Sequence, residues 1–343
     1  MNEADRPAHE RDRKAEHIEL ALDPRIQLRP SAFDGVELEH QALPELDLGA
    51  VDCSTTFLGR QLSAPILISC MTGGTAEAAE INRNLALAAE EAGVALGVGS
   101  QRKAIEDPSQ AATFKVRAEA PSVPLLANLG AVQLNYGFGL AECRQAVEMI
   151  EADALALHLN PLQEALQPEG QCDFSGLADK IGAIVDGLEV PVIVKEIGCG
   201  LSQQTARLLE AVGVSIFDTA GLGGTSWARI EAWRAQDPEA GELFADWGVS
   251  TVDSIRQLGA IDGLTIIGSG GVRSGVDIAR ALALGADLAG LAQPFLKTAV
   301  VSSEATVQRL AGIRRELEIA MFCAGAADLS ALARVPVTVR TAG

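Results

Sequence analysis

Aromatic residues and long apolar runs are what this chain of 343 residues lacks most clearly. Phe, Trp and Tyr together make up 4% of the sequence, and there is one tyrosine. No uninterrupted stretch of about 18 apolar residues occurs, so we expect no membrane-spanning helix. Residues 1–20 are mostly charged and contain no apolar segment, so we also expect no secretory signal peptide. These absences predict a cytoplasmic protein.

Cysteine and histidine are present, but not in metal-binding patterns. The six cysteines are scattered, with no Cys-x-x-Cys pair and no short cluster with histidines. This spacing excludes the usual zinc sites and offers no disulfide framework, so we expect free thiols in a reducing compartment. Only four histidines occur, so chemistry that depends on histidine has few candidates.

Positive charge is in deficit. The chain carries 46 acidic and 27 basic residues, a formal net charge of −19. An acidic protein repels nucleic acids and anionic membranes, so neither is expected as a partner. A phosphorylated ligand would need cationic side chains gathered at its binding site. Hydrophobic residues make up 48% of the sequence, which supplies a sizeable core and excludes disorder as the main state.

Short apolar runs alternate with helical patterns from about residue 63 onward. Between the runs, apolar residues recur at steps of three and four, which is typical of helices packed on a sheet. Eight such strands separated by helices favour a parallel (β/α)8 TIM barrel, with an open doubly wound sheet as the alternative. The expected strands are residues 65–68, 94–98, 124–127, 154–159, 190–194, 215–217, 264–267 and 288–291.

We expect three parts along the chain. Residues 1–62 form an N-terminal arm and extension, residues 63–325 the barrel, and residues 326–343 a C-terminal tail. Residues 1–16 are charged and polar and are expected to be a flexible arm. An insertion at residues 227–247, between the sixth and seventh strands, holds all three tryptophans.

Polar and glycine-rich residues follow the predicted strands at their carboxyl ends. In a (β/α)8 barrel these ends face one mouth, where ligands bind. Lys195 comes directly after the apolar residues 192–194, so we expect its side chain in the mouth, where a desolvated ammonium group needs an anion or a paired charge. Glycine-rich turns at residues 223–225 and 270–273 favour a bound phosphate group.

Two further segments carry candidate chemistry. The segment after the fourth strand contains His158 and Glu164. His158 is either an ordinary hydrogen-bonded residue at a strand end or a functional group. Glu164 is a single carboxylate, so a full protein cage for a divalent cation is not expected, whereas Mg²⁺ held by one carboxylate and substrate phosphates is chemically natural. A basic cluster near the start, which includes Arg11, Arg13 and Lys14, is either a solvated charge run or a cover that meets a diphosphate.

These segments together resemble the type 2 isopentenyl-diphosphate isomerases, an FMN-dependent family. The resemblance covers about residues 13–325. Its most specific parts are the Arg-Lys-x-Glu-His start at residues 13–17 and the His-x-Asn-Pro-x-Gln-Glu segment at residues 158–164. The other matching segments are residues 71–74, 100–102, 128–131, 195–196, 223–227 and 269–273.

The resemblance implies a flavoprotein isomerase of isoprenoid biosynthesis that moves a double bond between isopentenyl and dimethylallyl diphosphate. It implies FMN in its reduced form, Mg²⁺, a nicotinamide reductant such as NADPH, and a homo-oligomer, either a tetramer or an octamer. The implied FMN contacts are Met71, Thr72, Gly73, Ser100, Asn128, Lys195, Thr225, Gly271, Val272, Arg273, Ala292 and Gln293. The implied substrate contacts are Arg13, Lys14, His17, Ser100, Gln101, Arg102 and Gln163. Gln163 and His158 are the catalytic candidates beside reduced FMN as acid and base, and Glu164 is the implied metal ligand.

Two positions depart from the family pattern, and two other functions compete. Ala220 stands where many relatives carry serine, and Gln293 where many carry arginine, both near the expected phosphate end. The competing functions are an FMN-dependent oxidoreductase, of the hydroxy-acid oxidase or inosinate dehydrogenase kind, and a non-catalytic flavin- or phosphate-binding protein. Those oxidoreductases need a histidine base or a cysteine nucleophile around or after the sixth strand. The chain has no histidine after His158 and no cysteine in residues 218–250, which favours the isomerase.

Overall fold

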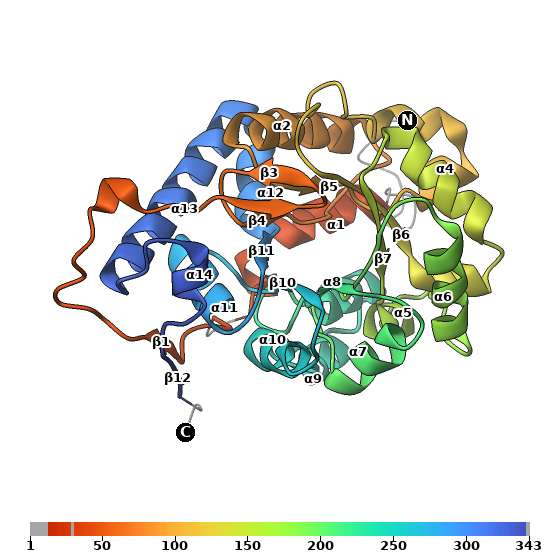
Figure 1. Ribbon diagram of the computed structural model, residues 1–343. Coiled ribbons are helices and arrows are strands. Elements are labelled where there is room, and N and C mark those ends of the chain that lie inside the picture. The colour runs from red at the N-terminus through yellow and green to blue at the C-terminus, as the bar shows by residue number, and fades with distance from the viewer. Residues whose placement is uncertain (1–12, 29–30, 341–343) are drawn as a thin grey trace.

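A closed barrel of eight parallel strands forms the centre of the molecule (Figure 1). The structure, a computed structural model, describes residues 13–28 and 31–340. The strands are β4 (Ile66–Ile68), β5 (Ala95–Gly97), β6 (Leu125–Gly130), β7 (Ala154–His158), β8 (Val192–Lys195), β9 (Ile216–Asp218), β10 (Thr265–Ser269) and β11 (Leu288–Leu291). They pair in chain order, and β11 closes the ring against β4. The predicted (β/α)8 barrel is therefore confirmed and the open sheet is excluded, with small shifts at the strand ends.

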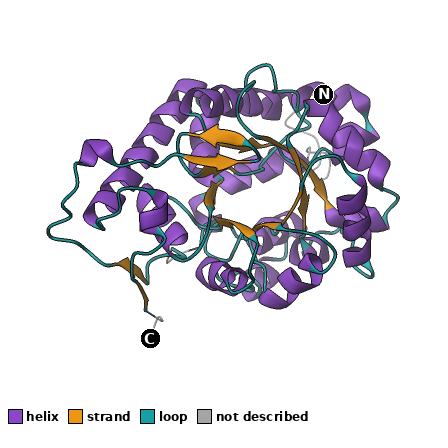
Figure 2. Cartoon of the chain, viewed as in Figure 1, coloured by secondary structure: helices purple, strands orange, loops and turns teal. Residues whose placement is uncertain are grey.

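Helices ring the barrel and bury the outer face of its sheet, whereas side chains of the strands fill the interior (Figure 2). Local sequence sets their ends: α2 starts after Thr75, whose side chain accepts the N–H of Ala78, and ends at Gly93 in the left-handed conformation, φ 65°. The helices after the strands are α2 (Ala76–Ala92), α3 (Arg102–Glu106), α4 (Leu140–Ile150), α5 (Pro161–Leu166), α6 (Leu177–Gly187), α7 (Gln203–Glu210), α8 (Trp227–Ala235), α9 (Pro238–Leu243), α10 (Thr251–Gly259), α11 (Gly275–Ala283), α12 (Gln293–Ala299) and α13 (Ser303–Cys323). The predicted insertion between the sixth and seventh strands forms α8 and α9.

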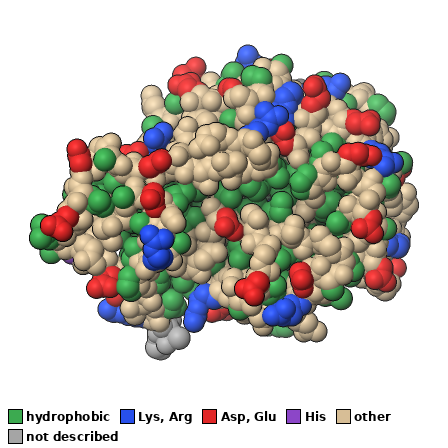
Figure 3. Space-filling model, in the orientation of Figure 1, with side chains coloured by type: hydrophobic (Ala, Val, Ile, Leu, Met, Phe, Trp, Pro, Cys, Tyr) green, Lys and Arg blue, Asp and Glu red, His purple; other side chains and the backbone are tan. Residues whose placement is uncertain are grey.

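A hairpin from the N-terminal extension closes the amino-terminal end of the barrel. It consists of β2 (Thr55–Phe57) and β3 (Arg60–Leu62). Phe57 and Leu62 pack on apolar residues at the starts of the barrel strands, among them Leu67 and Ile193. Apolar side chains accordingly gather near the centre of the face seen in Figure 3. The hairpin thus fills the centre of this end with apolar side chains, and the carboxyl ends of the strands, where ligands bind in such barrels, lie at the opposite end.

The rest of the extension and the C-terminal tail pack against the barrel. Helix α1 (Arg13–Leu22) contacts α8 and α12, so the expected flexible arm is wrong for Arg13–Glu16; residues 1–12 lie outside the described part of the chain. The tail contributes α14 (Leu329–Leu332) and β12 (Val337–Val339), and β12 pairs with β1 (Val36–Leu38) of the extension. The division at residues 62 and 325 stays a prediction.

The described helices also bear on the membrane question. Within residues 13–28 and 31–340, no helix is long and apolar enough to cross a bilayer.

Candidate active site

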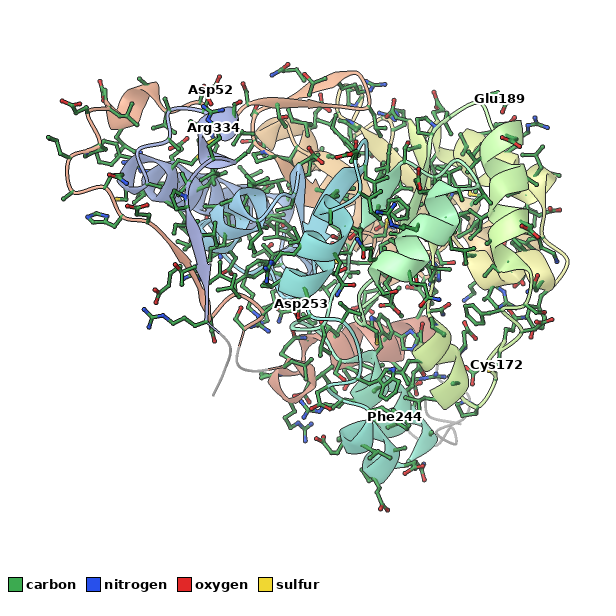
Figure 4. All side chains as sticks on the ribbon, turned by 60° about the horizontal axis from the view of Figure 1, so that its bottom comes forward. Asp52, Cys172, Glu189, Phe244, Asp253 and Arg334 are labelled. Atoms are coloured by element: carbon green, nitrogen blue, oxygen red, sulfur yellow. The ribbon has the colours of Figure 1, made fainter. Side chains whose placement is uncertain are left out.

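A cavity of about 560 Å³ lies at the carboxyl ends of the barrel strands and under α1. Its volume is that of a cofactor or small-ligand site. Figure 4 turns this end of the molecule downward, with Cys172 and Phe244 labelled near it and Glu189 at the other end. The predicted site residues that line the cavity are Lys14, His17, Met71, Thr72, Ser100, Arg102, Asn128, His158, Gln163, Glu164, Lys195, Thr225, Gly271, Val272, Arg273, Ala292 and Gln293.

The remaining predicted residues are placed differently. Gln101 is fully buried in the barrel wall: its Nε2 donates to the carbonyl of Ala146 at 2.8 Å, and its Oε1 accepts the N–H of Asn128 at 2.9 Å. These bonds hold the Gln101 side chain in the wall, and Gln101 is not among the residues that line the cavity. Gly73 packs on Phe114 outside the cavity lining, and a Cβ on Gly73 would lie 1.9 Å from that ring. The side chain of Arg13 lies outside the described residues.

Buried polar atoms without protein partners line one part of the cavity. Within the described residues, Ser69 Oγ, Thr72 Oγ1 and Gln293 Nε2 make no hydrogen bond. Leaving such a group buried and unpaired costs about 1–3 kcal/mol, so these atoms indicate a polar ligand. Beside them, Gly271 has φ 77°, and a Cβ there would lie 2.3 Å from the carbonyl oxygen of Gly223. The two glycine-rich loops therefore touch backbone to backbone. The unpaired polar atoms and the two glycine-rich loops fit a phosphorylated cofactor such as FMN.

A buried lysine and a buried carboxyl group lie at the same level of the barrel. Lys195 on β8 pairs in register with Asp218 on β9, and both line the cavity with only 6% and 2% of their surfaces exposed. Lys195 Nζ donates to the carbonyl of Glu196, and Ser269 Oγ donates to Asp218. Burial raises the pKa of Asp218, while the charge of Lys195 opposes that shift. The predicted lysine therefore does point into the mouth, with a potential counter-ion beside it.

His158 is held as a neutral imidazole. Its Nδ1 lies 2.8 Å from Asn128 Oδ1, so Nδ1 carries the proton and Nε2 is left as an acceptor. Burial, together with the charges of Lys195 and Lys14, lowers the pKa of His158 to about 3. A ring with this pKa carries no positive charge at neutral pH. In the structure His158 therefore presents Nε2 as a hydrogen-bond acceptor.

Gln163 and Glu164 both reach the cavity because α5 starts at Pro161, directly after β7. Glu164 is 7% exposed, and its two oxygens accept hydrogen bonds from the side chain of Asn160, the side chain of Gln167 and the main-chain N–H of Gln171. All three donors are neutral amides, so none of these hydrogen bonds pairs the carboxylate with a cationic side chain. Among the described residues, no three His, Cys, Asp or Glu side chains converge as a metal site. Glu164 thus fits a metal ion that takes its other ligands from substrate and water.

A second carboxylate, Glu231, was not found from the sequence. Its side chain on α8 is fully buried: Oε1 accepts from Gln163 Nε2 at 2.7 Å and lies 3.1 Å from His17 Nε2, and Oε2 accepts from Arg234 Nη1 at 2.6 Å. Burial opposes ionisation of Glu231, but these neighbours outweigh it and lower its pKa. Arg234 also donates from Nε to Glu16 at 3.1 Å, which ties α1 to α8. The only available signal was the i,i+3 spacing of Glu231 and Arg234, which many surface helices share.

The chain is similar to known proteins over almost its whole length. A family model described as FMN-dependent dehydrogenase matches residues 25–120 and 165–338. An isopentenyl-diphosphate delta-isomerase of Paracoccus zeaxanthinifaciens is 52% identical over 333 residues, covering 94% of this chain and 95% of that one. One of Synechocystis sp. is 49% identical over 337 residues, covering 96% and 97%.

Solved structures show a likeness of fold. Mandelate oxidase with benzoyl-formic acid superposes with a TM-score of 0.64 at 17% identity, covering 94% of this chain and 90% of that one. At this identity the likeness extends to the barrel architecture alone. The family model and the half-identical relatives over almost the whole length go further: this chain belongs to the isopentenyl-diphosphate delta-isomerases within the FMN-dependent dehydrogenase family.

Proposed function

We propose that the protein interconverts isopentenyl and dimethylallyl diphosphate, using reduced FMN, Mg²⁺ and a nicotinamide reductant such as NADPH. The observation that carries this proposal is one cavity whose lining holds two chemically different sets of side chains. One set is the unpaired atoms of Ser69, Thr72 and Gln293 together with the buried Lys195. The other set is Arg102 and Lys14 together with the buried Glu164. We assign the first set to FMN, as the flavin end of the site, and the second set to a diphosphate with its metal ion, as the diphosphate end.

At the flavin end, Lys195, Thr72 and Gln293 would bind FMN, with its phosphate at Gly271–Arg273 and Thr225. The residues proposed for FMN are Met71, Thr72, Gly73, Ser100, Asn128, Lys195, Thr225, Gly271, Val272, Arg273, Ala292 and Gln293. Bound reduced FMN supplies an electron-rich ring that stabilises positive charge on a tertiary carbon and can exchange a proton with it. The buried ammonium group of Lys195 at the end of β8 would stabilise negative charge on the bound FMN.

At the diphosphate end, Arg102 and Lys14 would bind substrate oxygens, with Arg13, His17 and Ser100 as further proposed contacts. Charge-assisted hydrogen bonds of this kind are about twice as strong as neutral ones. They are needed because the protein carries a net charge of −19. Glu164 would hold Mg²⁺, which supplies positive charge to the same diphosphate.

Between the two ends, Gln163 would orient the reacting alkene. Its amide is fixed on both sides, because Nε2 donates to Glu231 and Oε1 accepts from Asn160 Nδ2 at 3.0 Å. His158 offers Nε2 only as an acceptor. Helix α1 covers the cavity through the Arg234–Glu16 ion pair, and a covered site limits the access of water to a carbocation. These residues would orient the alkene and keep water away from it, and an allylic proton shift needs both from the protein.

An anaerobic turnover assay tests this proposal. The FMN-loaded protein, Mg²⁺, NADPH and isopentenyl diphosphate are incubated in D₂O, and the vinyl and dimethylallyl signals are followed by proton NMR. We expect dimethylallyl diphosphate to accumulate with deuterium incorporation, and the rate to collapse without FMN or Mg²⁺. Absence of isomerisation with bleached, fully bound flavin would overturn the proposal. Size-exclusion chromatography with light scattering tests the proposed homo-oligomer, a tetramer or octamer.

A further inference from the structure

Gln171 lies between the proposed diphosphate ligand and the proposed metal ligand and bonds to both. Its main-chain N–H donates to Glu164 Oε2 at 2.7 Å, and its side-chain Oε1 accepts from Arg102 Nη1 at 3.1 Å. We propose that Gln171 is a positioning residue that keeps Arg102 and Glu164 apart and holds each ready for its ligand. The inference rests on the proposed function, because the roles of Arg102 and Glu164 belong to it.

The two charges would otherwise interfere with each other. Arg102 and Glu164 line the same cavity, and a guanidinium matches a carboxylate in a two-bond geometry. Such a pair would occupy the oxygens that a metal ion needs and the N–H groups that a diphosphate needs. In the structure Arg102 instead contacts Gln171 and, through Nε at 2.7 Å, Glu106 of its own helix. Gln171 thus gives each charged group a neutral partner.

The surrounding chain fixes Gln171 in this place. Gly170 passes so close to α5 that a Cβ on it would lie 1.7 Å from the carbonyl oxygen of Glu164. The buried Gln133 donates from Nε2 to Gln171 Oε1 at 3.0 Å, a second hydrogen bond to the same atom that Arg102 uses. The main chain and the side chain of Gln171 are therefore both held. The direction of its carbonyl oxygen is set by the fold and not by Arg102 alone.

The contacts of Gln171 predict that its effect on metal binding depends on Arg102. Gln171→Ala keeps the main-chain N–H but removes the acceptor, so Arg102 becomes free to turn toward Glu164. We expect the concentration of metal needed for half-saturation to rise by about fivefold. In an Arg102→Gln background, where no guanidinium can turn, the same substitution should change it by less than about twofold.

The experiment measures binding on the FMN-loaded protein and needs no turnover. Mn²⁺ is titrated in the presence of inorganic diphosphate, free Mn²⁺ is read by electron paramagnetic resonance, and the four proteins of the Gln171→Ala and Arg102→Gln cycle are compared. Gln61→Ala is the matched control, since it removes an exposed glutamine side chain from the hairpin at the other end of the barrel. Gln171→Leu repeats the test with a side chain of similar bulk and no acceptor.

The inference is supported if a Gln171 variant weakens Mn²⁺ binding when Arg102 is present and not in the Arg102→Gln background. Equal effects in both backgrounds, or no effect in either, overturn it. Diphosphate affinity that is unchanged by Arg102→Gln overturns both the inference and the role given to Arg102. A protein that shows the coupling but does not isomerise the substrate would overturn the proposed function and leave this inference standing.

Discussion

Gln163 Nε2 donates a hydrogen bond to Glu231 Oε1 at 2.7 Å, and this contact joins the segment after β7 to helix α8. An ionised carboxylate can only accept, so the bond decides which end of the Gln163 amide is nitrogen. Oε1 then faces Asn160 Nδ2 at 3.0 Å. The amide, which lines the cavity, is thereby locked in one orientation, and this is the preorganisation that an alkene-positioning residue requires.

Replacing Gln163 should lower kcat more than it changes substrate affinity. Gln163→Ala removes the positioned amide, and we expect kcat to fall by roughly 10- to 100-fold, with a smaller change in the Mg²⁺ requirement. Gln163→Glu keeps the size of the side chain but places a second carboxylate against Glu231, so we expect kcat to fall further than in Gln163→Ala. Steady-state kinetics on both variants measure this. A pure KM effect in Gln163→Ala would contradict the role in orienting the alkene.

Removing the charge of Glu164 should weaken the binding of Mg²⁺ at the site. Glu164→Gln keeps the shape and loses the anionic oxygen that Mg²⁺ prefers, so we expect the half-saturating Mg²⁺ concentration to rise by at least about tenfold. Glu189→Gln, an exposed change at the other end of the barrel (Figure 4), is the matched control. Mg²⁺ titrations in the turnover assay compare the three proteins. A wild-type response in Glu164→Gln would show that the metal is held elsewhere.

His158 should make the fold sensitive to mild acid. Burial holds the pKa of the folded ring at about 3, whereas the unfolded chain takes up a proton near 6.5. Unfolding therefore binds a proton between these values, and the free energy of unfolding must fall as the pH drops from about 6.5 toward 3. Between pH 7 and 5 we expect a loss of about 1–2 kcal/mol that is missing in His158→Asn. Urea unfolding of both proteins at each pH tests the difference; equal losses would contradict a neutral His158.

Cys172 should be the cysteine that reacts first with alkylating reagents. It is exposed, whereas burial raises the pKa of the Cys53 and Cys70 thiols to about 11 and of the Cys143 and Cys199 thiols to about 12. Since the thiolate is the nucleophile, a shift of two units lowers the reactive fraction about 100-fold. Timed iodoacetamide labelling with peptide mass spectrometry measures the order. Early labelling of Cys143 or Cys199 would contradict it.

Arg234 should contribute strongly to stability, unlike its neighbour Arg229 on the same helix. Arg234 is 12% exposed and bonds to the fully buried Glu231 and to Glu16 of α1. Arg234→Ala strands a buried carboxylate, so we expect a loss of about 3 kcal/mol. Arg229→Ala breaks an ion pair with the exposed Glu242 and should cost about 1 kcal/mol or less. Guanidinium chloride unfolding compares the two; equal losses would refute the special role of Arg234.

The barrel and most of its mouth could be predicted from the chain alone. The signal is local: short apolar runs separated by amphipathic helices force parallel pairing, and parallel strands place their carboxyl ends at one side. Lys195 is the clearest case, because its place at the end of β8 predicted a buried cation in the cavity, and the cavity contains it. The motif around His158 and Glu164 was readable for the same reason, since it follows β7 directly.

The direction and partners of individual side chains were decided only by the tertiary structure. Gln101 lies just beyond the carboxyl end of β5 as Lys195 lies at the carboxyl end of β8, yet the Gln101 amide turns into the wall to bond Asn128 and Ala146. Glu231 meets Gln163 across 68 positions of sequence, and Gln171 meets Arg102 across 69. Thus the sequence by itself determined which segments reach the mouth, because strand order and periodicity are properties of the chain. Which atoms face the ligand depended on contacts between segments far apart in the sequence, and these contacts form only once the barrel has closed.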